Sequence, residues 1–406
     1  MRIIILYLFV FFSLFGVNFA GLPVWTKTNF IVGIIGLVYW ILLKEKKSQT
    51  ITLLFISGLL ILLTCLASGI INFRFDSWIF QHYILCCFIY VFNSFIITKW
   101  AIKAGVDFYG ILKITIGCIF INNILALSAF YLPSLADAIL SVQDFSVASF
   151  GYDYGVRRIY GFGDGGTNFG GGVTCSIGLI FAVFLFVNNK LGLIKTIIVV
   201  LFLTFSGILI ARTSVLGAAF AIGSITLYKC EKSKKTYFII SIMLICIVSF
   251  MILFSLFGEL DAFQYSFDMF TNYESGGGLS NGSTDKLFNE HWAKLPHDIK
   301  TWLFGDSRML DIHGSGYYMH TDVGYLRMIF CFGITGLAFF IVNHIIIIKY
   351  SHKILNDSNT YRLVILLFIY ILILNIKGLV DSLFWIMALP LFYYEMFQDR
   401  KSTRLN

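Results

Sequence analysis

The chain has 406 residues, of which 58% are hydrophobic, 17% are aromatic and only 13% are charged. Soluble domains carry about 25% charged residues, so no soluble fold of this length can hide so much apolar surface, and lipid must surround most of the chain. The formal net charge of +8 includes short lysine clusters of the kind that orient membrane helices, which argues against nucleic acid as a partner.

A helix that crosses a membrane needs about 20 mostly apolar residues. The sequence contains twelve apolar runs, at 3–21, 29–43, 51–71, 78–98, 108–130, 172–188, 193–210, 213–228, 237–257, 322–348, 361–376 and 380–397. The first run ends in small residues, as a cleaved signal peptide does, but we interpret it as an uncleaved anchor because its removal would spoil the orientation pattern described next. The sequence therefore predicts an all-α integral membrane protein with about twelve transmembrane helices.

Lysine and arginine predict the orientation, since they favour the cytoplasmic side of a membrane. With a cytoplasmic N-terminus, nineteen of the thirty fall in inner loops and tails, and eleven are spread over a much longer outer sequence. Every alternate connection fits this arrangement. We therefore expect a single polytopic membrane domain, residues 1–406, with both termini cytoplasmic and two large periplasmic loops at 131–171 and 258–321.

The kind of basic residue also differs between the two sides. The inner side has fifteen Lys and four Arg, whereas the outer side has five Lys and six Arg. The outer arginines are Arg74, Arg157, Arg158, Arg212, Arg308 and Arg327. Lysine suffices for orientation, whereas arginine binds phosphate or carboxylate with two parallel hydrogen bonds. This asymmetry indicates an anionic ligand on the outer side.

The cysteine pattern predicts neither a disulfide framework nor a metal site. Of the eight cysteines, all but Cys230 lie in or at the edge of apolar runs, and none lies in the two long loops. No paired metal-ligand spacing occurs, so we interpret the cysteines as small apolar residues. We expect no metal and no cofactor.

Two groups of outer arginines are candidates for binding. Arg212 lies in the turn between two short apolar runs, where a charge near lipid is costly and usually functional. The alternative is an arginine that snorkels at a turn.

Arg157 and Arg158 precede a glycine-rich stretch, 161–172, that matches G-x-G-x-x-G by count. No strand precedes it, so we expect no dinucleotide-binding fold. We interpret the stretch as an arginine pair on a backbone that a ligand can approach closely. The alternative is an outer loop whose arginines are solvated.

The second outer loop combines imidazoles with carboxylates. It holds four of the seven histidines, His291, His297, His313 and His320, without the HExxH spacing of zinc enzymes. Histidine carries protons near neutral pH. We expect 286–303 to form an amphipathic surface helix. Further along, Lys377 is predicted to pair with Asp381, the alternative being a second cation for an anionic substrate. His82 is predicted to be a polar helix-packing group.

Three stretches resemble the bacterial O-antigen polymerase (Wzy) family and the related O-antigen ligases. Residues 158–168 are similar to that family's Arg-x-x-Gly loop, and 210–217 to its Arg-Thr turn between two spans. Residues 320–337 are similar to its His-x-His-Asn-x-Tyr-Leu run followed by Gly-Ile-x-Gly-Leu. Asp322 stands where the ligase pattern has its second histidine, and Val323 replaces the asparagine, which favours the polymerase.

The resemblance implies a metal-independent glycosyltransferase at the periplasmic face of the bacterial inner membrane. It would join undecaprenyl-diphosphate-linked glycan repeat units into a surface polysaccharide, within membrane lipid and with a chain-length regulator as a further partner. Asp322 or His320 would be the general base, with inversion at the anomeric carbon. Arg157, Arg158, Arg212 and Arg308 would bind the diphosphate, and Tyr325 the substrate. The alternatives are the ligase and a polysaccharide flippase or transporter, whose charges should lie within the spans.

Overall fold

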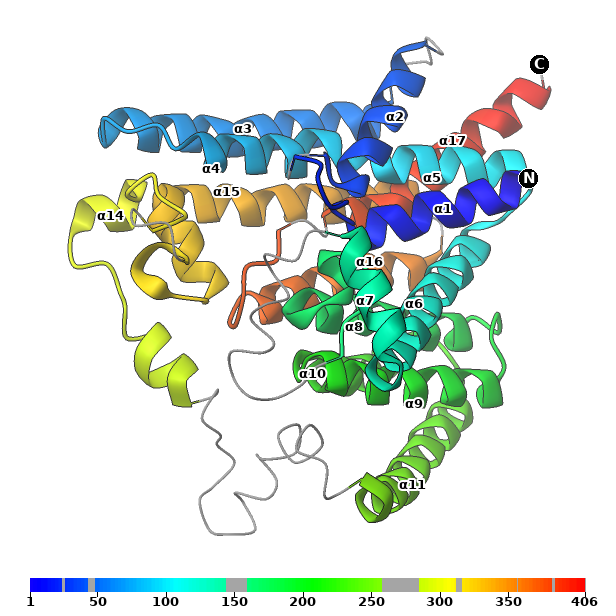
Figure 1. Ribbon diagram of the computed structural model, residues 1–406. Coiled ribbons are helices and arrows are strands. Elements are labelled where there is room, and N and C mark those ends of the chain that lie inside the picture. The colour runs from blue at the N-terminus through cyan, green and yellow to red at the C-terminus, as the bar shows by residue number, and fades with distance from the viewer. Residues whose placement is uncertain are drawn as a thin grey trace. The chain divides into compact units, whose positions relative to one another are not determined.

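The computed structural model describes residues 1–23, 26–42, 48–143, 159–257, 285–311, 316–355, 357–381 and 384–405. Every named element in these ranges is a helix (Figure 1). Extended pairing in the same ranges is limited to two isolated bridges, Phe19 with Gln143 and Leu310 with Tyr317. The prediction of an all-α fold is confirmed for the described part of the chain.

Each of the twelve apolar runs lies mainly on helix. The helices concerned are α1 (Arg2–Phe15), α2 (Thr28–Leu42), α3 (Gln49–Ile71), α4 (Ser77–Ile84), α5 (Val91–Ala104), α6 (Phe108–Tyr131), α8 (Asn168–Val187), α9 (Leu193–Ile210), α10 (Thr213–Ser224), α11 (Lys232–Phe257), α15 (Gly324–Ile354), α16 (Ser358–Leu374) and α17 (Phe384–Leu405). Among the described residues, six helices are long and apolar enough to cross a membrane: α3, the continuous Ser77–Ala104 helix, α6, α8, α9 and α15. The chain is an all-α membrane protein, and the count of twelve crossings stays a prediction.

Local sequence signals explain where several helices begin. Ser48, Asp76, Asp107 and Asp357 each accept a hydrogen bond from a backbone N–H of the first turn that follows them. These N–H groups have no partner within the helix, so a side-chain oxygen at this position stabilises the helix start by about 1 kcal/mol. The same residues separate apolar runs in the sequence, and they therefore fix the helix boundaries.

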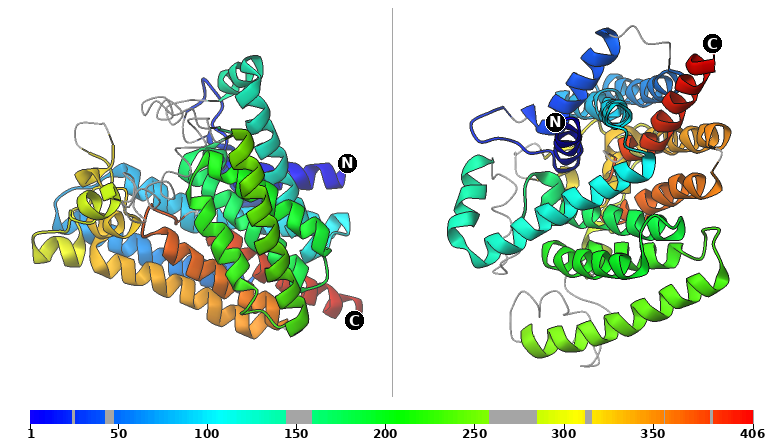
Figure 2. Two further views of the ribbon diagram at one scale, coloured as in Figure 1. Left: turned by 90° about the horizontal axis from the view of Figure 1, so that it is seen from below. Right: turned by 90° about the vertical axis from the view of Figure 1, so that its right-hand side faces the viewer.

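The described chain divides into two compact units. Unit 1 comprises 1–32 and 100–279, and unit 2 comprises 33–99 and 280–406. In unit 1, α8 is buried along most of its length and packs against α6, α9 and α10. A Cβ on Gly217 of α10 would lie 1.9 Å from the Ser176 hydroxyl of α8, so these two helices approach more closely than larger residues permit. α11, in light green in Figure 2, packs against α9.

Unit 2 is built on α3, on α15 and on α4 with its helical continuation. α3, α4 and α15 run side by side in Figure 1, and a short helix, α14 (Ile299–Phe304), lies at one end of α15. α4 continues into α5 through a single π-helical turn, η2 (Leu85–Ile89). π-Helical turns inside α-helices often accompany functional sites. We call the end of unit 2 that carries the α3–α4, α14–α15 and α16–α17 connections the connection end.

Helix α15 is broken at Gly333. This residue has φ 73° and ψ −176°, a conformation that only glycine adopts readily. A Cβ at Gly333 would lie 2.2 Å from the Leu303 carbonyl group, because the end of α14 presses into the break. Gly333, the first glycine of the Gly-Ile-x-Gly-Leu stretch, therefore permits both the break in α15 and the close approach of α14.

The backbone groups freed by this break are satisfied by neighbouring segments. The Asp306 N–H donates to the Phe330 carbonyl at 2.7 Å, and the Ser68 hydroxyl of α3 donates to the Cys331 carbonyl at 2.9 Å. The Thr335 hydroxyl donates to the Leu303 carbonyl at 2.8 Å. Buried backbone groups are normally paired, so the break is a built feature of unit 2.

The continuous helix expected over 286–303 is wrong. The structure has a π-helical turn, η5 (Leu287–His291), and then α14, with Pro296 between them. Proline lacks the N–H that a helix interior needs, and Asp298 caps α14 by accepting from the Thr301 N–H at 2.6 Å.

In the first predicted outer loop, α7 (Pro133–Val142) and the short η4 (Asp164–Gly166) are helical.

Candidate functional site

The connection end of unit 2 carries four of the predicted site residues: Arg308, His320, Asp322 and Tyr325. Arg212 belongs to unit 1. Arg157 and Arg158 lie outside the described residues, as does His313. The four residues of unit 2 come from a short segment between α14 and the first turn of α15, so the sequence itself places them close together.

Hydrogen bonds among polar side chains fold the segment between α14 and α15. The Thr301 hydroxyl donates to Asp306 Oδ1 at 2.6 Å, and the Tyr318 hydroxyl donates to Asp306 Oδ2 at 3.3 Å. Arg308 lies over the Tyr318 ring, with its guanidinium carbon 5.4 Å from the ring centre. Burial raises the pKa of Tyr318, and the Asp306 carboxylate adds to this effect. Tyr318 is therefore a neutral donor at physiological pH.

His320 is held in an unusual backbone conformation. It ends the short helix η6 (Tyr318–His320), and both His320 and Met319 have positive φ angles, of 50° and 56°. Its Nε2 lies 3.3 Å from Asp311 Oδ2, and 65% of its side chain is exposed. Strained non-glycine residues of this kind concentrate at functional sites. His320 is accessible, with a carboxylate at its ring.

Asp322 lies two residues before α15 and is exposed. His291 is its closest ionisable neighbour in the described ion pairs, with 3.9 Å between His291 Nε2 and Asp322 Oδ2. The Nδ1 atom of the same ring lies 3.1 Å from the His320 carbonyl oxygen, which Lys294 Nζ also approaches, at 3.0 Å. The loop histidine His291 thus fixes the backbone that presents Asp322, while the carboxylate remains open to solvent.

Tyr325 joins two helices of unit 2. Its hydroxyl donates to the Leu372 carbonyl of α16 at 2.6 Å, and its backbone N–H donates to the Asn375 carbonyl at 3.2 Å. Asn375 in turn bonds to both the N–H and the carbonyl of Val380, which closes the turn after α16. The side chain therefore positions α15 against α16, and a contact with substrate stays a prediction.

Arg327 is the residue that the sequence motifs did not single out. It stands among the outer arginines, but the structure buries it, with 8% of its surface exposed. Its guanidinium carbon lies 3.5 Å from the centre of the Tyr317 ring, and its Nε is buried without a hydrogen-bond partner in the described part of the chain. A buried cation with an unsatisfied donor is costly, so this position favours an anionic ligand.

Asp381 is a second buried charge at the connection end. Its Oδ2 lies 2.7 Å from His82 Nε2 of α4, and the positive charge of Arg327 also acts on it. The carboxylate that the sequence predicted to pair with Lys377 is therefore in contact with His82, the predicted polar helix-packing group. These two residues are 299 positions apart, so no local spacing could reveal the pair.

In unit 1, the glycine-rich stretch folds against the Arg212 turn. α9 ends at Ile210 and α10 begins at Thr213, which leaves Arg212 at the start of α10, half-buried. Ile159, the first described residue after the predicted arginine pair, donates its N–H to the Leu209 carbonyl at 3.4 Å. Ile159 therefore contacts α9 three residues before Arg212.

The glycines of this stretch have a structural use in unit 1. A Cβ on Gly163, at φ 65°, would lie 1.9 Å from the Phe15 carbonyl oxygen of α1. The Asn122 side chain accepts from the Phe162 N–H at 2.9 Å, and the Gln143 side chain accepts from the Gly163 N–H at 2.8 Å. We expected the glycines to let a ligand approach, whereas here they let the loop approach its own helices.

The connection end thus combines two kinds of chemistry in one unit. Exposed carboxylate and imidazole groups at Asp322 and His320 can accept a proton from a hydroxyl group. The buried guanidinium of Arg327 can stabilise negative charge that develops on a leaving group. Comparison with known protein families, curated proteins and solved structures finds no match to this chain.

Proposed function

We propose that this protein is a polymerase of a bacterial surface polysaccharide. It would join repeat units carried on undecaprenyl diphosphate at the periplasmic face of the inner membrane, with twelve crossings and the connection end outside. The observation that carries the proposal is the short stretch 317–327 of unit 2. It presents an exposed carboxylate, Asp322, and a buried guanidinium, Arg327, on either side of the helix start.

The reaction needs one general base and positive groups that stabilise the negative charge developing on the leaving group. The hydroxyl oxygen of the acceptor sugar attacks the anomeric carbon of the donor, and the bond from that carbon to the diphosphate oxygen breaks. The hydroxyl proton passes to Asp322, or to His320, and the diphosphate leaves with the bonding electrons. A single displacement of this kind inverts the anomeric carbon, so NMR that shows the same anomer in polymer and donor contradicts it.

The diphosphate leaving group calls for several cations. Arginine suits phosphate because its planar fork donates two parallel hydrogen bonds. Arg327 and Arg308 supply such groups in unit 2. The roles of Arg212, Arg157 and Arg158, which belong to unit 1, stay predictions from the sequence. Fixed cations in a site of low dielectric constant stabilise developing charge strongly because they need no reorganisation.

Deletion of the gene in its host tests the proposal in the cell. The expected result is that surface glycan collapses to core plus one repeat unit, because units are still made, exported and attached but no longer joined. The wild-type gene on a plasmid should restore the ladder. Loss of every capped species would contradict the polymerase, and long lipid-linked glycan in that case would favour the ligase over the flippase.

A further inference from the structure

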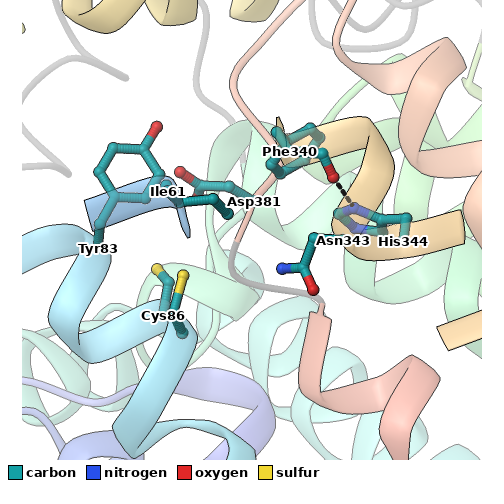
Figure 3. A pocket seen from close by; sticks show the side chains of 8 residues that line it. Ile61, Tyr83, Cys86, Phe340, Asn343, His344 and Asp381 are labelled. Atoms are coloured by element: carbon teal, nitrogen blue, oxygen red, sulfur yellow. Dashed lines mark hydrogen bonds between the residues drawn. The ribbon is translucent and has the colours of Figure 1, made fainter. Parts of the chain in front are cut away.

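A small buried cavity in unit 2 lies beside the His82–Asp381 pair. It is lined by Ile61 of α3, by Tyr83, Cys86 and Cys87 of the α4–η2 segment, by residues of α15 and by Asp381. Figure 3 shows Tyr83, Cys86, Asp381 and Asn343 around this cavity. A purely apolar cavity between membrane helices would need no explanation. The lining of this cavity, however, contains a carboxylate, a thiol and a phenol.

One wall of the cavity is a convergence of three potential metal ligands. His82 Nε2 lies 2.7 Å from Asp381 Oδ2 and 3.7 Å from Cys86 Sγ. Among the described residues, His82, Cys86 and Asp381 are the group of histidine, cysteine and acidic side chains whose ligand atoms all lie within 4.8 Å of one another. A single nitrogen thus lies close to both an oxygen and a sulfur, and the three ligand atoms can reach one ion.

These distances suit a tetrahedral ion. Zinc bonds of about 2.3 Å to sulfur and about 2.0 Å to nitrogen, at a tetrahedral angle, place the two ligand atoms roughly 3.5 Å apart, close to the 3.7 Å between His82 and Cys86. The nitrogen and oxygen would be about 3.4 Å apart around the ion, so the 2.7 Å contact with Asp381 has to lengthen by a fraction of an ångström. A side-chain rotation of this size is small.

The remaining cavity wall offers partners for a fourth ligand. The Tyr83 hydroxyl and the Asn343 Oδ1 are buried without a hydrogen-bond partner in the described part of the chain. Their residues are only 1% and 2% exposed. Buried polar groups are normally satisfied, so each of these two atoms calls for a polar partner, such as a water molecule in the cavity. The unpaired atoms therefore point independently to a ligand inside the cavity.

We propose that His82, Cys86 and Asp381 bind one zinc-like divalent cation, with a water molecule as the fourth ligand. Nitrogen, sulfur and oxygen donors together suit Zn²⁺ and exclude the hard ions Mg²⁺ and Ca²⁺, which prefer oxygen alone. Binding releases the thiol proton, and His82 has to present an unprotonated Nε2 to the ion. The ion would clamp the π-helical turn η2 to the segment between α16 and α17. The site goes beyond the proposed polymerase activity and does not depend on it.

Cobalt replaces zinc in such sites and reports thiolate ligation by colour. The full chain in detergent or nanodiscs, titrated with Co²⁺, should develop a sulfur-to-cobalt charge-transfer band that saturates at one ion per chain, and Zn²⁺ should abolish it. Cys86→Ser should remove the band and weaken Zn²⁺ binding by more than about 100-fold, because a ligand matters more than the outer-shell groups that cost 10–100-fold. His82→Asn and Asp381→Asn should weaken binding as well.

Cys87→Ser is the matched control, since Cys87 adjoins Cys86, is equally buried and lines the same cavity. It should keep the band. Absence of the band in the wild type, or its loss in Cys87→Ser and retention in Cys86→Ser, would overturn the proposal. If Cys86→Ser does not fold, X-ray absorption of the zinc-loaded wild type decides: one sulfur ligand at about 2.3 Å supports the site, and any other number of sulfurs contradicts it.

Discussion

The guanidinium of Arg327 lies against the face of Tyr317, with 3.5 Å between the guanidinium carbon and the ring centre. Stacking on an aromatic ring fixes the plane of the cation and leaves its in-plane donors free of the ring. Tyr317 and Arg327 each lie five residues from Asp322 in the sequence; Tyr317 belongs to the second predicted outer loop, and Arg327 to the first turn of α15.

Replacing Arg327 should stop polymerisation. Arg327→Ala should reduce the rate by about 100-fold or more, as loss of a fixed donor to a developing anion does in other enzymes. Arg327→Lys should restore little, because lysine lacks the planar fork. Arg74→Ala removes the same charge from an exposed position at the connection end and should be close to wild type. Equal activity in the two alanine variants would exclude Arg327 from the site.

Asp322 should matter more than His320 as a proton acceptor. We expect Asp322→Asn to be the more damaging change, measured as the length distribution of glycan chains, because it removes the base and keeps the shape. His320→Ala should be milder. Glu290→Gln is the control, since Glu290 is another exposed carboxylate of the same loop. If neither Asp322→Asn nor His320→Ala shortens the chains, the base lies elsewhere.

Arg212 is the test of the unit 1 arginines. Arg212→Ala should nearly abolish polymerisation, and Arg212→Lys should recover little, because a lysine at this turn replaces the charge but not the bidentate geometry. The variants have to reach the membrane in wild-type amounts for the comparison to hold. Full activity in Arg212→Ala at that level refutes a role for this arginine in binding the diphosphate.

The break in α15 should be intolerant of any side chain. Gly333→Ala combines a conformation that costs alanine about 2 kcal/mol or more with a Cβ placed 2.2 Å from the Leu303 carbonyl. We expect a lower melting temperature and less protein in the membrane. Gly223→Ala, in the exposed last turn of α10 with nothing within 4 Å of the new Cβ, should be neutral or mildly stabilising. Similar melting temperatures for both variants would contradict the structure at the break.

The cap of α14 should survive mild acid. The backbone N–H of Thr301 holds the pKa of the Asp298 carboxyl below its usual range. A group with a depressed pKa stabilises the fold above its ordinary pKa and loses this effect only as the pH falls through the lowered value. Hydrogen exchange of the Thr301 amide, corrected for intrinsic rates, should therefore stay slow below the usual carboxyl range. Asp298→Asn should remove the pH dependence; an unchanged profile would contradict the assignment.

The sequence predicted the elements better than the contacts between them. Apolar runs located the helices because lipid permits only chain whose backbone bonds are satisfied internally. The side chains that cap these helices, such as Asp76 and Asp107, were identified only in the structure. The break at Gly333 was not predicted, since it depends on α14, which follows a loop proline and presses in from a distant part of the chain. The helix expected over 286–303 was wrong because Pro296 lacks the N–H that a helix interior needs.

The candidate site was predicted in part. Arg308, His320, Asp322 and Tyr325 share one segment, so the sequence alone placed them together. Arg327 was visible only as one of six outer arginines, and its burial under Tyr317 needed the fold. The His82–Asp381 contact joins residues 299 positions apart, and such a pair leaves no mark in local spacing.

The most direct test of the polymerase uses the purified chain alone. The protein is reconstituted in lipid vesicles with an undecaprenyl-diphosphate-linked repeat unit, and the products are separated by size. The proposed function predicts a ladder of lipid-linked glycans together with one released undecaprenyl diphosphate for each bond formed, and no ladder with Arg327→Ala. Intact substrate after incubation with folded wild-type protein would contradict it.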